Sequence, residues 1–224
     1  MQTRPGEGEG PGALSALSDL EIVSLGHDLA AGQLADWLEA GLPADGDDGT
    51  RPLGVDVVGV LRPVEGDAVL VSLSDGSRAV VIDLTEILPE DEAVLARLLS
   101  DVERPKLVAD AKGSWHALSA RGLTLDGVIA DPSLAGYLCR PEQRSYDVET
   151  LTQRWLGIDL AAVNEGSAGG DGGSGESQSA FDLEALASQT VPTAHLASAR
   201  RAAALLLLQD VLDKQMAARD AVGL

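Results

Sequence analysis

The stretch that decides the fold covers residues 106–156, KLVADAKGSWHALSARGLTLDGVIADPSLAGYLCRPEQRSYDVETLTQRWL. Its apolar runs at 106–109 and 127–129 are too short for helices and predict two strands. Between them, residues 113–121 have the spacing of an amphipathic helix. Strands that alternate with helices in this way predict an α/β domain.

Two helices follow in the same stretch, and each begins with a recognisable cap. Asp131 precedes Pro132, which suits the first turn of a helix because proline has a fixed φ and no N–H group to leave unpaired. Asp147 precedes Val148 in a similar way. An aspartate at this position accepts hydrogen bonds from the first backbone N–H groups, so we expect Asp131 and Asp147 to cap their helices.

Three runs rich in β-branched residues precede this stretch, at 53–61, 68–73 and 78–84. The last two are joined by SDGS at 74–77, a sequence typical of a hairpin turn. Three consecutive strands with short connections predict an antiparallel meander. With the strands of the deciding stretch, the meander predicts a mixed sheet flanked by helices.

The rest of the chain supplies a short β-like run at 21–25 and helical patterns at 33–40, 90–99 and 194–219. All of these elements fit one domain of residues 19–224, which is long enough to bury a sizeable core.

Low-complexity segments mark the end and the breaks of this domain. We expect residues 1–18 to be a flexible leader, since their start is rich in Gly, Pro and Glu and has no signal-peptide pattern. A second break covers 43–52, and a third covers 164–179, where ten of the residues are Gly or Ser. We expect 164–179 to be a disordered loop, because it has almost no apolar side chains to offset the entropy of ordering.

Charge and composition limit the partners of the chain. It has 36 Asp and Glu against 16 Lys and Arg, and a formal net charge of −20 repels a phosphate backbone over most of the surface. Any contact with DNA must therefore be local or delegated. The longest apolar run, 202–208, is far shorter than the roughly 20 residues that span a membrane. The single cysteine, Cys139, fits a reducing, cytoplasmic location.

Several common kinds of site are missing from the sequence. His27, His116 and His195 lie at unrelated spacings without the Cys or Glu partners of a zinc site. No serine lies in a nucleophile elbow, and Cys139, within an apolar helical segment, fits a small core side chain. The chain has only three tryptophans, two tyrosines and one phenylalanine, so it lacks the aromatic platforms that stack single-stranded nucleic acid.

Carboxylate chemistry with Mg²⁺ is the class that remains. Such a site needs several acids from different elements to converge on two cations about 4 Å apart. Asp56 lies in the first strand of the meander, but Val58, on the same face two residues later, cannot bind a metal. The pattern alone leaves a functional Asp56 open and favours an ordinary polar strand residue.

Seven positions of the chain point to a family, namely Lys112, Gly122, Asp131, Tyr137, Asp147, Leu151 and Trp155. With the order of the elements, they resemble the 3′-5′ exonuclease domain of bacterial DNA polymerase I, the family A polymerases. The resemblance covers residues 53–160 and the last helix. It implies a ribonuclease-H-like fold and a parent protein that is a DNA-directed DNA polymerase of replication or repair.

The exonucleases of this family use four carboxylates and a tyrosine, and the chain departs from that set. Asp56 matches the Asp of the first motif, Asp-x-Glu, but Val58 stands in place of the Glu. Ser114 stands where the second motif has an Asp, and His195 and Ala199 stand where the third motif, Tyr-x-x-x-Asp, has its Tyr and Asp. One of the four carboxylates survives, so we expect no catalytic residues, no bound metal and no other cofactor.

The acids and aromatics that persist need no catalytic role. Capping explains Asp131 and Asp147, and core packing is expected for Tyr137 and Trp155. Asp110, four residues before Ser114, is the one further acid that could rescue a metal site.

The leading interpretation is a catalytically inactive 3′-5′ exonuclease-like domain with a structural role in a DNA polymerase I, without activity of its own. Its partners would be the polymerase and 5′ nuclease domains of the same parent chain, with DNA reached only through the parent enzyme. The domain is expected to be a monomer and to have no membrane partner. A divergent metal-dependent 3′-5′ exonuclease and a free-standing acidic protein-interaction domain remain as alternatives.

Overall fold

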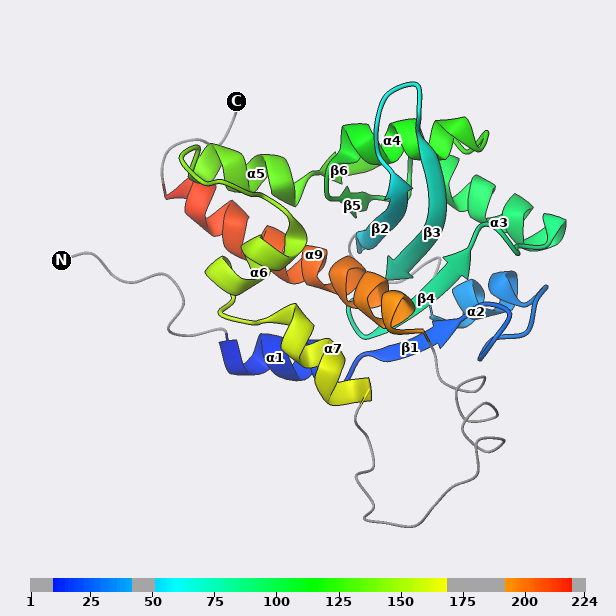
Figure 1. The fold of residues 1–224 in the computed structure, drawn as a ribbon, viewed down its shortest axis with the longest axis horizontal. Helices are drawn as coiled ribbons and strands as arrows, with labels where there is room; N and C mark the ends of the chain where they lie inside the picture. Colours follow the sequence, from blue (N-terminus) through cyan, green and yellow to red (C-terminus); the bar gives the residue numbers. More distant parts are fainter. Residues whose placement is uncertain (1–9, 42–50, 169–191, 219–224) are drawn as a thin grey trace, which may run out of the picture.

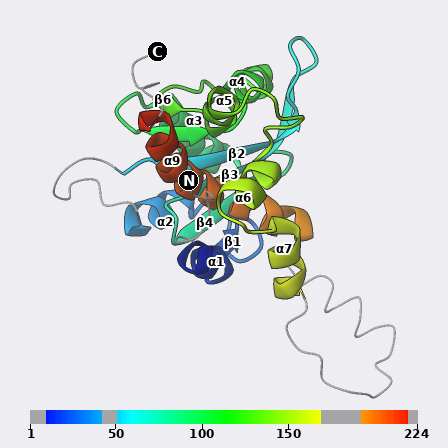
Figure 2. The same ribbon diagram turned by 90° about the vertical axis from the view of Figure 1, so that its left-hand side faces the viewer.

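The structure, a computed structural model, describes residues 10–41, 51–168 and 192–218. A six-stranded mixed sheet forms its centre, with helices packed on both faces (Figure 1, Figure 2). The α/β class and the mixed sheet predicted from the sequence are confirmed.

Every strand expected from the sequence is present in the sheet. The bounds are β1 Glu21–Ser24, β2 Leu53–Val60, β3 Asp67–Ser74, β4 Arg78–Asp83, β5 Lys106–Val108 and β6 Val128–Ala130. Their order across the sheet is β1-β4-β3-β2-β5-β6. The strands β2, β3 and β4 form the predicted antiparallel meander, and β1, β5 and β6 pair in parallel with their neighbours.

Helices cover both faces of this sheet. Their bounds are α1 Gly10–Ser18, α2 Leu34–Gly41, α3 Pro89–Ser100, α4 Ala111–Ala120, α5 Pro132–Cys139, α6 Val148–Trp155, α7 Leu160–Ala168 and α9 Thr193–Ala217. The sequence patterns predict α2 to α6 and α9, but not α1 or α7.

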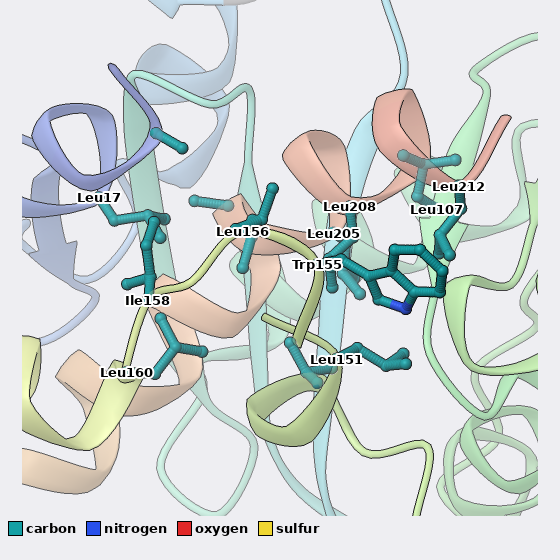
Figure 3. Close-up of a cluster of buried hydrophobic side chains, with 14 of the residues drawn as sticks. Leu17, Leu107, Leu151, Trp155, Leu156, Ile158, Leu160, Leu205, Leu208 and Leu212 are labelled. Carbon is teal, nitrogen blue, oxygen red and sulfur yellow. The ribbon is translucent and has the colours of Figure 1, made fainter. Parts of the chain in front are cut away.

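Two apolar cores lie on opposite faces of the sheet. Strand β2 shows the division, because Leu53, Val55 and Val57 enter one core while Gly54 and Asp56 face α9. The first core packs against α2, α3 and α4. The second core brings α1, α5, α6, α7 and α9 together, and Figure 3 shows its tryptophan, Trp155 of α6, beside Leu205 and Leu208 of α9.

Helix α9 lies directly on β2 because Gly54 has no side chain. A Cβ atom at Gly54 would overlap the backbone carbonyl oxygen of Ala202. Ala202 is buried at this contact, and the next two residues, Ala203 and Ala204, are also small and buried. The contact fixes which residues of α9 face β2 and thereby positions the site described below.

Two expectations about the leader and the loop need correction. Residues 10–18, expected in a flexible leader, form α1, and its Leu17 is fully buried in the second core. Tertiary burial of this kind stabilises a short helix that its own sequence would not. Residues 164–168, expected in the disordered loop, continue α7. The parts of these expectations that concern 1–9, 43–50 and 169–179 lie outside the described residues.

Candidate functional site

Asp56 lies in β2 with its side chain toward α9, and it is only 9% exposed. The hydroxyl of Ser198, on α9, donates a hydrogen bond of 2.7 Å to Oδ2 of Asp56. The Oγ atoms of Ser198 and Ser72, on β3, also lie 2.7 Å apart. Hydroxyl groups from a strand and a helix therefore form one side of the environment of this carboxylate.

Arg201, almost one turn further along α9, binds the rest of the Asp56 carboxylate. Its Nη2 lies 2.9 Å from Oδ2, and its Nε lies 3.1 Å from each of the two carboxylate oxygens. Its Nη1 donates to Oε1 of Glu149, on α6, at 3.2 Å. Burial lowers the pKa of Arg201, but the hydrogen bonds and charges of Asp56 and Glu149 outweigh burial and raise it above its usual value. A permanent cation is therefore held between two carboxylates.

Val58 and Ser114 bring no charge to this arrangement. Val58 lies on the same face of β2 as Asp56 and pairs with Leu70, just before a bulge in the strand. Ser114 is buried in α4, where its Oγ donates to the backbone carbonyl oxygen of Ala109 at 3.3 Å. The hydroxyl of Ser114 therefore bonds to the backbone just before its own helix.

His195 and Ala199, both on α9, lie in two different environments. Nδ1 of His195 is 2.7 Å from Oγ of Ser24, at the end of β1. Burial lowers the pKa of His195, and the nearby carboxylate of Asp83 raises it by less. Ala199 is fully buried among the apolar side chains of the second core. The contacts that α9 makes with Asp56 come instead from Ser198 and Arg201, one residue before and two residues after Ala199.

Three further aspartates act at helix starts. Oδ1 of Asp110 accepts a hydrogen bond from the backbone N of Gly113 at 3.1 Å, and its φ of 46° places it in the left-handed region. Asp131 and Asp147 accept hydrogen bonds from backbone N–H groups in the first turns of α5 and α6. The capping roles predicted for Asp131 and Asp147 are confirmed.

Cys139 and Trp155 are buried, as predicted, whereas the prediction for Tyr137 is wrong because this side chain is 48% exposed. Helix α5 turns its small residues inward, since a Cβ atom at Gly136 would lie 2.7 Å from Cδ2 of Leu151. Tyr137 is left on the outer face, where its ring meets Tyr146 edge-on with centroids 5.5 Å apart.

Sequence reasoning missed Arg201, the residue that defines the site. The available signal was a pair of arginines, Arg200 and Arg201, in a helix whose other residues are mostly small or apolar. A charge on a core-facing helix needs a partner. Arg200 is also buried, and its Nη1 donates to Oδ1 of Asn164 at 2.7 Å. Among the residues that the structure describes, no group of three or more His, Cys, Asp or Glu side chains is arranged to hold a metal ion.

Comparisons with known proteins establish the family. Residues 63–163 match a family model described as DNA polymerase I, ribonuclease H-like domain. The DNA polymerase I of Mycobacterium tuberculosis is 36% identical over 201 residues, which are 89% of this chain. The chain is an exonuclease-like domain of the DNA polymerase I family. It spans 20% of the length of the M. tuberculosis protein.

Solved structures agree with this assignment of the exonuclease-like domain. The POL domain of Pol1 from M. smegmatis, in complex with DNA primer-template and dNTP, is 33% identical with a TM-score of 0.63, covering 86% of this chain and 27% of that one. Escherichia coli RNase D, an exoribonuclease involved in structured RNA processing, gives a TM-score of 0.57 at 16% identity, over 90% of this chain and 47% of that one. The second likeness concerns the fold alone, and the ribonuclease-H-like fold is confirmed.

Proposed function

We propose that this exonuclease-like domain is catalytically inactive and serves a DNA polymerase I as a structural domain. The observation that carries the proposal is the ion pair of Asp56 and Arg201, with Nη2 and Oδ2 2.9 Å apart. A divalent cation at this carboxylate would have to displace both Arg201 and the hydroxyl of Ser198. Displacement would leave a guanidinium that is only 20% exposed without its main partner, which is unfavourable.

The residues around Asp56 do not fit a pair of divalent cations. Mg²⁺ and Mn²⁺ require several oxygen ligands, and a two-cation site draws carboxylates from several elements. The positions that correspond to the family's other acids carry Val58, Ser114 and Ala199. Glu149 supplies a second carboxylate near Arg201, but its Oε1 is bonded to that arginine and its side chain is 51% exposed.

The domain would act as part of a longer polymerase in DNA replication or repair. The M. tuberculosis relative is five times as long as the matched region. This length supports polymerase and 5′ nuclease domains as the partners of this domain within one chain. The net charge of −20 supports contact with DNA only through the parent enzyme. In the ranges that the structure describes, no helix is long and apolar enough to cross a membrane. A cytoplasmic location and a monomeric domain complete the proposal.

A nuclease assay tests the proposal. The purified chain is incubated with a 3′-labelled single strand of DNA in millimolar Mg²⁺ or Mn²⁺, with a chelator as the blank. We expect no digestion above the blank. Digestion that requires Mn²⁺ and is lost in Asp56→Ala would overturn the proposal and establish the divergent exonuclease instead.

Rebuilding a carboxylate cluster around Asp56 gives a second test. The triple variant Val58→Glu, Ser198→Asp, Arg201→Ala should place two new acids beside Asp56 and remove the guanidinium. In chelator the acids repel one another, so the melting temperature should fall, and Mn²⁺ should restore it. At a cation concentration about 100 times Kd, the gain is about 2.7 kcal/mol.

The matched control is the triple variant Val58→Gln, Ser198→Asn, Arg201→Ala, which has similar shapes without the new charges. Neither this control nor the parent chain should respond to Mn²⁺. A parent chain that is stabilised by Mn²⁺ as strongly as the acidic variant would contradict the proposed loss of the metal site.

A further inference from the structure

The outer face of α5 carries large apolar side chains that nothing in the described ranges covers. Leu134, Tyr137 and Leu138 are spaced by three and four residues, and they are 57%, 48% and 45% exposed. The inner face of the same helix is formed by small residues that are buried. A helix that is apolar on both faces is typical of a helix with neighbours on both sides.

Two more side chains extend this surface. Ile129, on the edge strand β6, is 63% exposed, and Trp115, on α4, is 47% exposed. The starts of α4 and α5 are held together, because Oδ2 of Asp131 accepts a hydrogen bond from the backbone N of Ala111 at 2.9 Å. Helices α4 and α5 and strand β6 lie along the same side of the domain in both views (Figure 1, Figure 2). We call the five residues the α5 patch: Trp115, Ile129, Leu134, Tyr137 and Leu138.

The segment that carries the α5 patch is electrically balanced, unlike the chain as a whole. Residues 110–146 contain four basic and four acidic side chains, whereas the whole chain has a net charge of −20. An exposed apolar patch without excess charge suits the surface of another protein domain. It does not suit a nucleic acid, because binding to a phosphate backbone depends on an excess of cations.

We infer that the α5 patch docks against the polymerase portion of the parent DNA polymerase I, an inference that rests on the proposed function. The related M. smegmatis chain offers a large remainder, since this domain matches only 27% of it. The C-terminal end of α9 packs beside α5, so the last described residues of the chain lie near the patch (Figure 1). A portion tethered there has a high effective concentration at the patch.

Hydroxyl-radical labelling of aromatic side chains tests the docking. Trp115 and Tyr137 are labelled in the 224-residue chain and in the full-length polymerase that contains it. We expect both to be labelled several-fold more slowly in the full-length protein. Trp37 lies on α2, a helix far from α5 in Figure 1, so it is the internal control and should be labelled equally in the two proteins.

Variants of the full-length polymerase provide a second measurement. The triple variant Leu134→Ser, Tyr137→Ser, Leu138→Ser should separate the thermal unfolding of this domain from that of the polymerase portion. The double variant Leu14→Ser, Leu88→Ser changes apolar residues of similar exposure outside the patch and should not. Because all of these side chains are exposed, the substitutions should leave the domain folded.

Four results would overturn the inference. The first is equal labelling of Trp115 and Tyr137 in both proteins, and the second is thermal unfolding that the triple variant does not change. The third is protection of these two side chains from labelling only when primer-template DNA is present. The fourth is their protection in the 224-residue chain alone, at concentrations where it sediments as a dimer. The third and fourth results would assign the patch to nucleic acid or to a second copy. If no polymerase contains this sequence, the proposed function itself fails, which is a separate result.

Discussion

Two buried charges lie on neighbouring parallel strands, Asp56 on β2 and Lys106 on β5, and they are satisfied in different ways. Nζ of Lys106 donates to the backbone carbonyl oxygens of Asp101, Arg104 and Asp126 at 2.8, 2.9 and 3.0 Å, none of them more than 20 residues away in the sequence. The partners of Asp56 on α9 are 142 and 145 residues away. Nearby turns are enough to satisfy the first charge, but the second depends on the complete tertiary fold.

The two charges also differ in what they do for the molecule. Burial lowers the pKa of Lys106, and the carboxylates of Asp101 and Asp126 offset part of that effect. Its ammonium group joins the loops before β5 and β6 through backbone oxygens alone. Asp56 and Arg201 instead form a side-chain pair, and Asp56 is the residue that the sequence resemblance matches to the family's first motif. Mutations can separate these two roles.

Removing the cation from the Asp56 pair should have the largest effect. Arg201→Met keeps an apolar stem but leaves the Asp56 carboxylate buried with Ser198. Removing one partner of a buried pair costs about 3–5 kcal/mol, and because Arg201 is 20% exposed we expect about 3 kcal/mol. The free energy of unfolding in urea measures the loss.

Two further variants control this measurement. The double variant Asp56→Leu, Arg201→Met should recover most of the loss, because it removes both charges. Ser198→Ala removes only a hydroxyl donor and should cost about 1 kcal/mol. If Arg201→Met costs no more than Ser198→Ala, the ion pair does not hold α9 on β2 in the way described.

Lys106→Met should have an intermediate effect. The three carbonyl oxygens lose their donor, but the variant also removes the cost of burying an ammonium group, so we expect a loss of about 2 kcal/mol. Lys106→Arg is the charged control and should also destabilise the domain, because a planar guanidinium cannot reproduce the position of Nζ. A loss larger than that of Arg201→Met would contradict the ranking of the two charges.

The contact of His195 with Ser24 also joins distant parts of the chain, but it involves no permanent charge. Removing it should therefore have the smallest effect on stability. Burial lowers the pKa of His195 in the folded chain. At pH values between this lowered pKa and the unfolded pKa of about 6.5, the unfolded chain therefore binds more protons than the folded chain. The stability from neutral His195 is therefore complete above about pH 6.5 and is lost as the pH falls through the folded pKa.

Urea titrations at a series of pH values measure this contribution. The parent chain should lose more stability than His195→Gln between about pH 7 and about pH 5. Equal slopes for the two proteins, or a steeper slope for the variant, would show that the contact of His195 with Ser24 does not favour the neutral ring.

Features with local determinants could be predicted from the sequence. The caps at Asp131 and Asp147 depend on residues within one helical turn. The hairpin turn at 74–77 is similar, because the backbone N of Ser77 donates to Oδ1 of Asp75 at 2.8 Å. The strands of the meander follow from runs of β-branched residues. The fold class could be predicted because these local features agree with one another.

The features that could not be predicted depend on packing between distant parts of the chain. Helix α1 begins with glycine and proline, and it is stabilised by burial of Leu17, whose carbonyl oxygen accepts a hydrogen bond from Nε of Arg200 at 3.2 Å. The exposure of Tyr137 is set by the close fit of Gly136 against Leu151. The partner of Asp56 lies on a helix whose register is fixed only when Gly54 meets Ala202.

The contact between Gly54 and Ala202 has a consequence for the substitutions that this domain can tolerate. By bringing α9 onto β2, this contact lets Arg201 reach Asp56. Substitution of either residue alone is then expected to lower the free energy of unfolding. Loss of Arg201 leaves a buried anion without its partner, and loss of Asp56 leaves a buried cation without its partner. Either loss is a large part of the roughly 5–15 kcal/mol by which domains are typically stable. The two positions are therefore coupled: we expect a substitution at either residue to be tolerated better when the other residue is replaced at the same time.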